Sequence, residues 1–140
     1  MNTSLDRTLS VADAPSDARA WLVRGYSMLP EGRLEDARVC FSRAAELAPD
    51  SAVPVLLDAT VVMLMGDLRC ALRLIQRLGR RHPEVWLVRL HEAEVLLRLG
   101  RERRARKVLE SLTGASLTEE EAMFAAALGH AVEAVNQARP

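Results

Sequence analysis

The sequence predicts an all-α fold: a solenoid of three helix pairs followed by a C-terminal capping helix. Three observations support this prediction. The chain repeats itself with a period of 34 residues and needs no insertion to do so. Only two Trp, one Tyr and two Phe are present, so the core must consist mostly of Leu, Ala, Val and Met, which favours helix. Glycines and prolines also recur where one helix would end and the next begin.

Length and composition indicate one soluble globular domain. The chain has 140 residues, of which 49% are hydrophobic and 27% charged. Met1 to Ala14 contains no apolar run of the kind a secretion signal needs. The most apolar stretch, Ala52 to Met65, is too short for a membrane span and contains Pro54 and Asp58. We therefore expect a cytoplasmic protein that does not insert into membranes.

The repeat is recognised by small and bulky residues that recur at equivalent positions, 34 residues apart. A small residue in the middle of the first helix of each pair allows the second helix to approach closely, and a glycine between the helices provides the turn. The four clearest sets are Gly25, Ala59 and Ala93; Gly32, Gly66 and Gly100; Ala37, Ala71 and Ala105; and Phe41, Ile75 and Leu109.

Helix breakers divide each repeat into two helices. In the first repeat, a helix from Ala18 to Leu29 stops at Pro30, and a second helix runs to Pro49. In the second repeat, Pro54 marks a helix start and Pro83 closes the second helix. The expected repeats cover residues 18–51, 52–85 and 86–117.

One further helix is predicted after the third repeat. Thr118 and Glu121 have the spacing of a capping box, and Phe124, Leu128 and Val132 then form one apolar face. A helix over residues 118–138 would cover the apolar side of the last repeat, which a solenoid otherwise exposes. We expect residues 1–15 to be a flexible lead and residues 16–140 to be a single domain.

These residues resemble a known repeat family. The first repeat is similar to the tetratricopeptide repeat through the run Trp21-x3-Gly25-x6-Gly32-x4-Ala37-x3-Phe41-x2-Ala44-x4-Pro49. Two degenerate copies follow in the same register, and the whole resemblance covers residues 18–119. The third copy departs from the pattern, with Arg89 in place of the Trp and Leu117 in place of the closing Pro. The resemblance implies a right-handed α-solenoid that binds other proteins.

The resemblance also implies where a partner would bind. In tetratricopeptide proteins the first helix of each pair lines a concave groove, and the matching positions here are mainly apolar. They are Leu22, Tyr26, Leu29, Leu56, Thr60, Met63, Leu90, Glu94 and Leu97. Relatives that clamp acidic chaperone tails carry Lys and Asn at four of these positions, so that clamp is missing. Two interpretations stay open: ordinary core filling, or a trough for an apolar peptide or amphipathic helix.

Positive charge is concentrated in the middle of the chain. Residues 69–107 contain twelve basic and four acidic side chains, although the whole chain has 19 of each. Within this block, Arg101, Arg103, Arg104 and Lys107 fall where a helix begins, which is unfavourable for cations. The cluster is either a solvated face, a secondary protein contact or a nucleic-acid contact. No aromatic residue lies among the arginines, which disfavours nucleic acid.

No arrangement of residues indicates catalysis, a metal or a cofactor. His82, His91 and His130 do not have the spacing of metal ligands, and no phosphate-binding loop is present. Cys40 and Cys70 are thirty residues apart and are expected to be reduced and buried. We expect a protein that is not an enzyme.

A narrower resemblance bears on function. The segment from Pro83 to Gly100 is similar to the third repeat of the small bacterial chaperones of type III secretion. This resemblance implies that the groove holds an apolar segment of an export substrate, a needle or translocator subunit, without nucleotide, and that a second small co-chaperone takes part. The alternative is a general tetratricopeptide adaptor unrelated to secretion.

Overall fold

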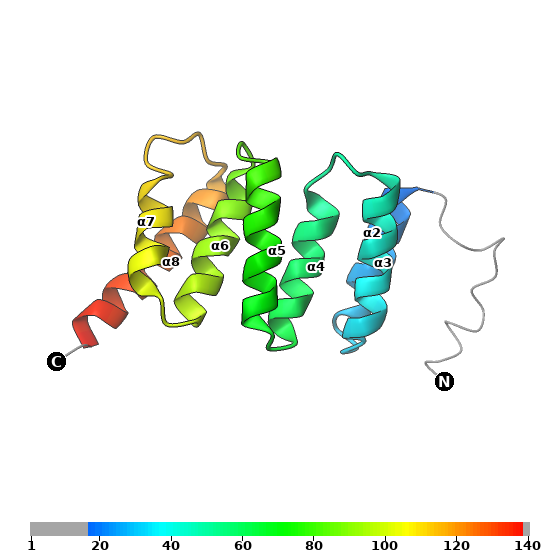
Figure 1. Cartoon of the computed structure of the whole chain (residues 1–140), viewed down its shortest axis with the longest axis horizontal. Coiled ribbons are helices and arrows are strands. Elements are labelled where there is room, and N and C mark those ends of the chain that lie inside the picture. The colour runs from blue at the N-terminus through cyan, green and yellow to red at the C-terminus, as the bar shows by residue number, and fades with distance from the viewer. Residues whose placement is uncertain (1–16, 139–140) are drawn as a thin grey trace. The chain divides into compact units, whose positions relative to one another are not determined.

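A computed structural model of the chain describes residues 17–138, and all regular structure within this range is helical. The predicted lead over residues 1–15 lies outside the described residues. Between residues 17 and 138, seven helices follow one another (Figure 1). Their bounds are α2 Ala18–Met28, α3 Leu34–Leu47, α4 Val53–Leu64, α5 Leu68–Arg81, α6 Trp86–Arg98, α7 Glu102–Glu110 and α8 Glu119–Ala138. The helices form two compact units, Met1–Pro54 and Val55–Pro140.

The turn inside each helix pair repeats with the predicted period. Gly32, Gly66 and Gly100 all adopt positive φ angles, of 72°, 89° and 78°. The amide that follows each glycine donates to a carbonyl five residues earlier, with N···O distances of 3.1, 3.2 and 2.8 Å. This is the helix-ending bond of a Schellman motif, which requires a left-handed residue and so favours glycine. The predicted turns are therefore confirmed in all three pairs.

In the first unit, α2 and α3 pack around a ring. Phe41 is fully buried, and a Cβ added to Gly25 would lie 2.5 Å from its Cε1 atom. The predicted close approach is real, but Gly25 makes room for the Phe41 ring in particular. Cys40 is also buried here, with its Sγ 3.9 Å from the Sδ of Met28.

In the second unit, α6 is the central helix. It packs against α5, α7 and α8 (Figure 1). Its Val88, Leu90 and Val95 have no exposed surface. Helix α8 also contacts α7, and its Leu128 and Val132 are buried. The fold therefore covers α6 from several sides with the chain's own helices.

The predicted capping box at the start of α8 is confirmed. The amide of Glu121 donates to Thr118 Oγ1 at 3.1 Å, and the amide of Thr118 donates to Glu121 Oε1 at 2.9 Å. Three glutamates in the first turn, residues 119–121, also complement the positive end of the helix. Among the described residues, no helix is both long and apolar enough to cross a membrane.

One helix is shorter than its counterparts, and one expectation is wrong. Helix α7 has nine residues, against fourteen in α3 and α5, so the second helix of the third repeat ends early. Its last turn is closed at Ser111, and Gly114 adopts a positive φ of 86° shortly afterwards. Cys70, expected to be buried, is half-buried at the start of α5, although it is a free thiol as expected.

Candidate protein-binding site

The predicted groove positions on α2 offer accessible apolar surface. Tyr26 is 57% exposed, and Leu22 and Leu29 are half-buried. The Tyr26 ring meets Phe41 edge-on, with ring centroids 6.4 Å apart and an angle of 78° between the planes. Val23, which the prediction did not include, is 63% exposed on the same helix. Tyr26 is therefore a supported aromatic side chain that projects toward solvent.

The three predicted positions on α4 are more covered. Leu56 and Met63 are 6% and 5% exposed. Thr60 is half-buried, and its hydroxyl donates to the Leu56 carbonyl at 2.9 Å, one turn earlier in the same helix. The exposed large apolar residues of this segment lie at its two ends, Val53 at the start of α4 and Leu64 and Met65 at and just after its end. Their exposure has no signal in the repeat register.

The predicted positions on α6 differ again. Leu90 is completely buried, and Leu97 is half-buried. Glu94 accepts a hydrogen bond from His91 Nδ1 at 3.0 Å and forms an ion pair with Arg98 at 3.3 Å. The hydrogen bond with His91 lowers the pKa of Glu94 below its usual value, although partial burial opposes this effect. This part of the predicted groove is polar and engaged within the chain.

Helix α8 contributes to this closure of α6. The Phe124 ring lies edge-on to the His91 ring, with centroids 5.1 Å apart. On the other side of α8, Arg106 of α7 forms an ion pair with Glu133 at 3.8 Å. The last helix thus occupies the position of a partner for the third pair, which agrees with the capping role expected from the sequence.

The predicted basic cluster lies on α7 and at its start. Arg101 is half-buried at the N-cap, and Arg103, Arg104 and Lys107 are exposed. The expectation that all four belong to the beginning of the helix is wrong for Lys107. Because α7 is short, Lys107 falls in the last turn, where a cation is favourable. Glu102 supplies the acidic residue of the first turn and is 5% exposed.

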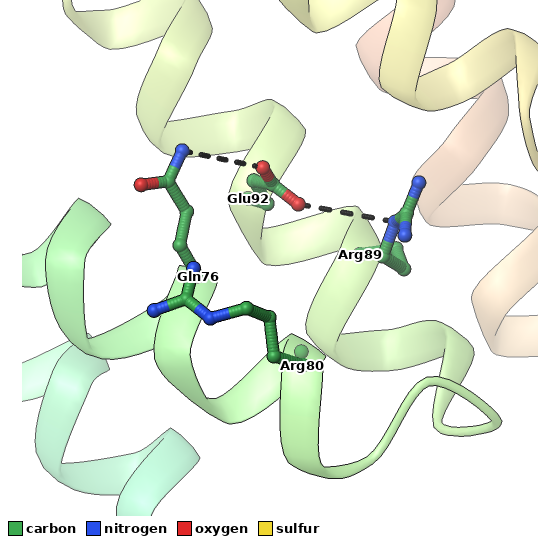
Figure 2. A pocket seen from close by; sticks show the side chains of 5 residues that line it. Gln76, Arg80, Arg89 and Glu92 are labelled. Carbon is green, nitrogen blue, oxygen red and sulfur yellow. Dashed lines mark hydrogen bonds and ion pairs between the residues drawn. The ribbon is translucent and has the colours of Figure 1, made fainter.

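A polar pocket of about 270 Å³ lies between α5 and α6 (Figure 2). Figure 2 shows Glu92 between two partners. Gln76 donates to it at 3.5 Å, and Arg89 approaches it at 3.8 Å. Arg89, which replaces the repeat's Trp, also donates to Ser111 Oγ at 2.9 Å. Glu92 thus offsets one of the two arginine charges of this pocket, those of Arg80 and Arg89.

Two histidines of the described chain, His82 and His91, lie near acidic side chains. Between residues 17 and 138, no group of three or more His, Cys, Asp or Glu is placed to hold a metal ion. His82 lies 3.9 Å from Glu84, two residues away, and His91 is engaged by Glu94.

The fold is that of tetratricopeptide repeat proteins. The sequence matches no protein-family model, and no curated protein is significantly similar to it. Solved structures are similar. The chaperone SycD of Yersinia enterocolitica type III secretion, in complex with a peptide of the translocator YopD, is 18% identical, with a TM-score of 0.72 over 85% of this chain and 92% of that one.

Two other structures show the breadth of this likeness. A type III secretion complex from Aeromonas hydrophila is 20% identical, with a TM-score of 0.71 over 96% of this chain and 87% of that one. The first tetratricopeptide domain of Spaghetti (RPAP3), bound to the HSP90 peptide SRMEEVD, is 14% identical, with a TM-score of 0.68 over 84% and 96%. At these identities the comparison establishes the fold.

Proposed function

We propose that the chain is a protein-binding tetratricopeptide module, with Leu22, Tyr26 and Leu29 of α2 as its principal contact. The observation that carries this proposal is the exposure of Tyr26, 57%, on a helix position where Phe41 supports it from behind. A rigid aromatic side chain with a polar tip is a favourable anchor, because it offers large contact area at a low entropic cost. The solved relatives SycD and RPAP3 were both captured with a peptide.

The partner surface is proposed to be apolar. The positions at which related domains hold acidic chaperone tails carry Leu22, Tyr26, Leu56 and Thr60 here. None of these side chains can pair with a carboxylate as Lys does. An apolar peptide or the apolar face of an amphipathic helix would bury hydrocarbon against Leu22 and Tyr26 of α2, which is favourable at about 25 cal/mol per Å².

More specifically, we propose a cytoplasmic bacterial chaperone of type III secretion that keeps a needle or translocator subunit soluble, with a second small co-chaperone. The likeness to SycD and to the Aeromonas complex supports this proposal. Such a task needs binding and release of an aggregation-prone segment, and it needs no catalytic residue. The alternative is an adaptor unrelated to secretion. The likeness to RPAP3, which is bound to an HSP90 peptide, supports protein binding without pointing to secretion.

Co-expression separates these two functions. Proteins encoded next to this chain's gene would be produced alone and together with it, and the soluble fraction of each would be measured. The chaperone proposal predicts a small secreted protein that is insoluble alone and soluble in a stoichiometric complex with the chain. If every neighbouring product is soluble alone and the chain binds only folded proteins, the adaptor is the correct function.

A further inference from the structure

The second unit contains a pocket with an excess of positive charge. The pocket, of about 230 Å³, lies between α5 and α7. Four arginines line it, together with one apolar and one amide side chain. The lining residues of this arginine pocket are Arg69, Leu72, Arg73, Gln76, Arg101 and Arg104.

None of the four arginines forms an ion pair with another described residue. Within residues 17–138, no ion pair engages Arg69, Arg73, Arg101 or Arg104, and no acidic residue lines the pocket. The neighbouring pocket of Figure 2 shares Gln76 but contains Glu92, which lies 3.8 Å from its Arg89. The contrast matters because like charges around one small space repel, and an anion in that space would relieve the repulsion.

The position of the pocket adds to its preference for anions. Arg101 is the N-cap residue of α7, and no side chain caps that helix by hydrogen bonding. The first turn of a helix carries partial positive charge and free amides, and the buried Glu102 of this turn offsets part of that charge. Three of the four arginines, Arg69, Arg73 and Arg104, are exposed, so their guanidinium groups are accessible from solvent. Arginine forks bind planar oxyanions in a bidentate manner.

We propose that the arginine pocket binds the carboxylates of an acidic segment of a partner protein, at a site separate from the apolar surface of α2. Leu72, 6% exposed, gives the pocket an apolar floor, and Gln76 can both donate to and accept from a peptide backbone. An acidic peptide with interspersed aliphatic residues matches this combination. Nucleic acid matches it less well, because no aromatic side chain lines the pocket for base stacking.

The test uses the full chain and a defined probe. The probe is a short fluorescein-labelled peptide that alternates Glu and Leu, and its control has Gln in place of Glu. The pocket variant Arg73→Gln/Arg104→Gln removes one arginine from each helix. The matched control variant Arg81→Gln/Arg103→Gln removes the same charge from exposed positions of the same two helices that do not line the pocket.

The proposal predicts that the Glu peptide binds and the Gln peptide does not. The pocket variant should bind the Glu peptide about tenfold more weakly, and the control variant should change affinity by less than about threefold. Arg73→Lys/Arg104→Lys should lose part of the affinity, because Lys retains the charge but not the fork. Added salt should weaken binding to the unmodified chain more than binding to the pocket variant.

Three outcomes would overturn the proposal. Equal loss of affinity in the pocket and control variants would show diffuse attraction to the whole basic block. Equal binding of the Gln peptide would show that carboxylates are not recognised. Tighter binding of a single-stranded oligonucleotide of the same net charge, lost in the pocket variant, would identify a nucleic-acid site. Thermal melts of both variants are expected to match the unmodified chain, since the substituted side chains are exposed.

Discussion

Helices α2 and α6 occupy the same place in the first and third repeats, yet they present different surfaces. Tyr26 of α2 is 57% exposed, and the residue in its register on α6, Glu94, has a side chain that is 21% exposed and engaged by His91 and Arg98. Leu22 is half-buried, whereas its equivalent Leu90 has no exposed surface. The register of a repeat therefore fixes the fold position of a residue but not its availability to a partner.

The packing behind the two helices also differs. The pair Gly25 and Phe41 in the first repeat corresponds by register to Ala93 and Leu109 in the third. A smaller residue on the first helix accompanies a larger one on the second, so the volume at the crossing is roughly conserved. In the first repeat this arrangement places the Phe41 ring edge-on beneath Tyr26. The aromatic pair is what makes the α2 surface distinct.

The largest effect is expected from removing the helix that covers α6. Deleting residues 117–140 would expose the faces of α6 and α7 on which Leu128 and Val132 are buried. We expect aggregation, or a loss of about 3 kcal/mol or more in the free energy of unfolding, measured by chemical denaturation.

A shorter truncation is the control for this deletion. Ending the chain after Glu133 retains Leu128, Val132 and the ion pair with Arg106, and the described residues that it removes, 134–138, are all exposed. It should leave the midpoint of unfolding nearly unchanged. A soluble and equally stable chain without residues 117–140 would contradict the capping role of α8.

A smaller effect is expected at the packing that supports Tyr26. In Gly25→Ala, the new Cβ would lie 2.5 Å from Phe41 Cε1, so the buried ring must move. We expect a net loss of about 1–2 kcal/mol in the free energy of unfolding, even though alanine has the higher helix propensity.

Gly129 provides the matched control for this substitution. It lies within α8, and an added Cβ would meet nothing within 4 Å. Gly129→Ala should therefore stabilise the protein, by up to about 1 kcal/mol. Combining Gly25→Ala with Phe41→Leu, which imitates the third repeat, should recover part of the loss. Equal effects of the two glycine substitutions would contradict the tight crossing.

The smallest effect concerns the polar character of α6. The hydrogen bond from His91 lowers the pKa of Glu94 in the folded state, so ionised Glu94 contributes stability above the pKa of the unfolded chain. That contribution is lost as the pH falls through the lowered folded pKa. Glu94→Gln should therefore lower the free energy of unfolding by less than about 1 kcal/mol near neutral pH. This difference in stability from the unmodified chain should shrink below about pH 4. A pH-independent difference would contradict the role of the charge.

Much of the fold could be predicted because its signals are local. A glycine in a tight turn and a Thr-x-x-Glu box act over a few residues, so Gly66 and Thr118 could be placed from the sequence. The early end of α7 could not, because Leu117 gave no stop signal and the turn at Gly114 lies outside the repeat register. Helix length there depends on the packing of α8 as well as on local preference.

The candidate sites could be predicted only in part. The face of α2 follows from helical periodicity, but the burial of Leu90 depends on which helices cover α6. The basic cluster near Arg101 was visible as a run of charge, whereas its juxtaposition with Arg69 and Arg73 of α5 requires the tertiary fold. Similarly, the repeat predicted a close crossing at Gly25 without indicating that Phe41 fills it.

The central claim, that α2 binds a partner through Tyr26, is tested most directly by a matched pair of substitutions. Tyr26 on α2 and Val39 on α3 are both 57% exposed in the same unit. The affinity for the partner found by co-expression and the melting temperature would be measured for Tyr26→Ser and Val39→Ser. We expect both variants to melt within a few degrees of the unmodified chain, with binding weakened about tenfold or more only by Tyr26→Ser. Equal affinities of the two variants, with both melts intact, would contradict the claim.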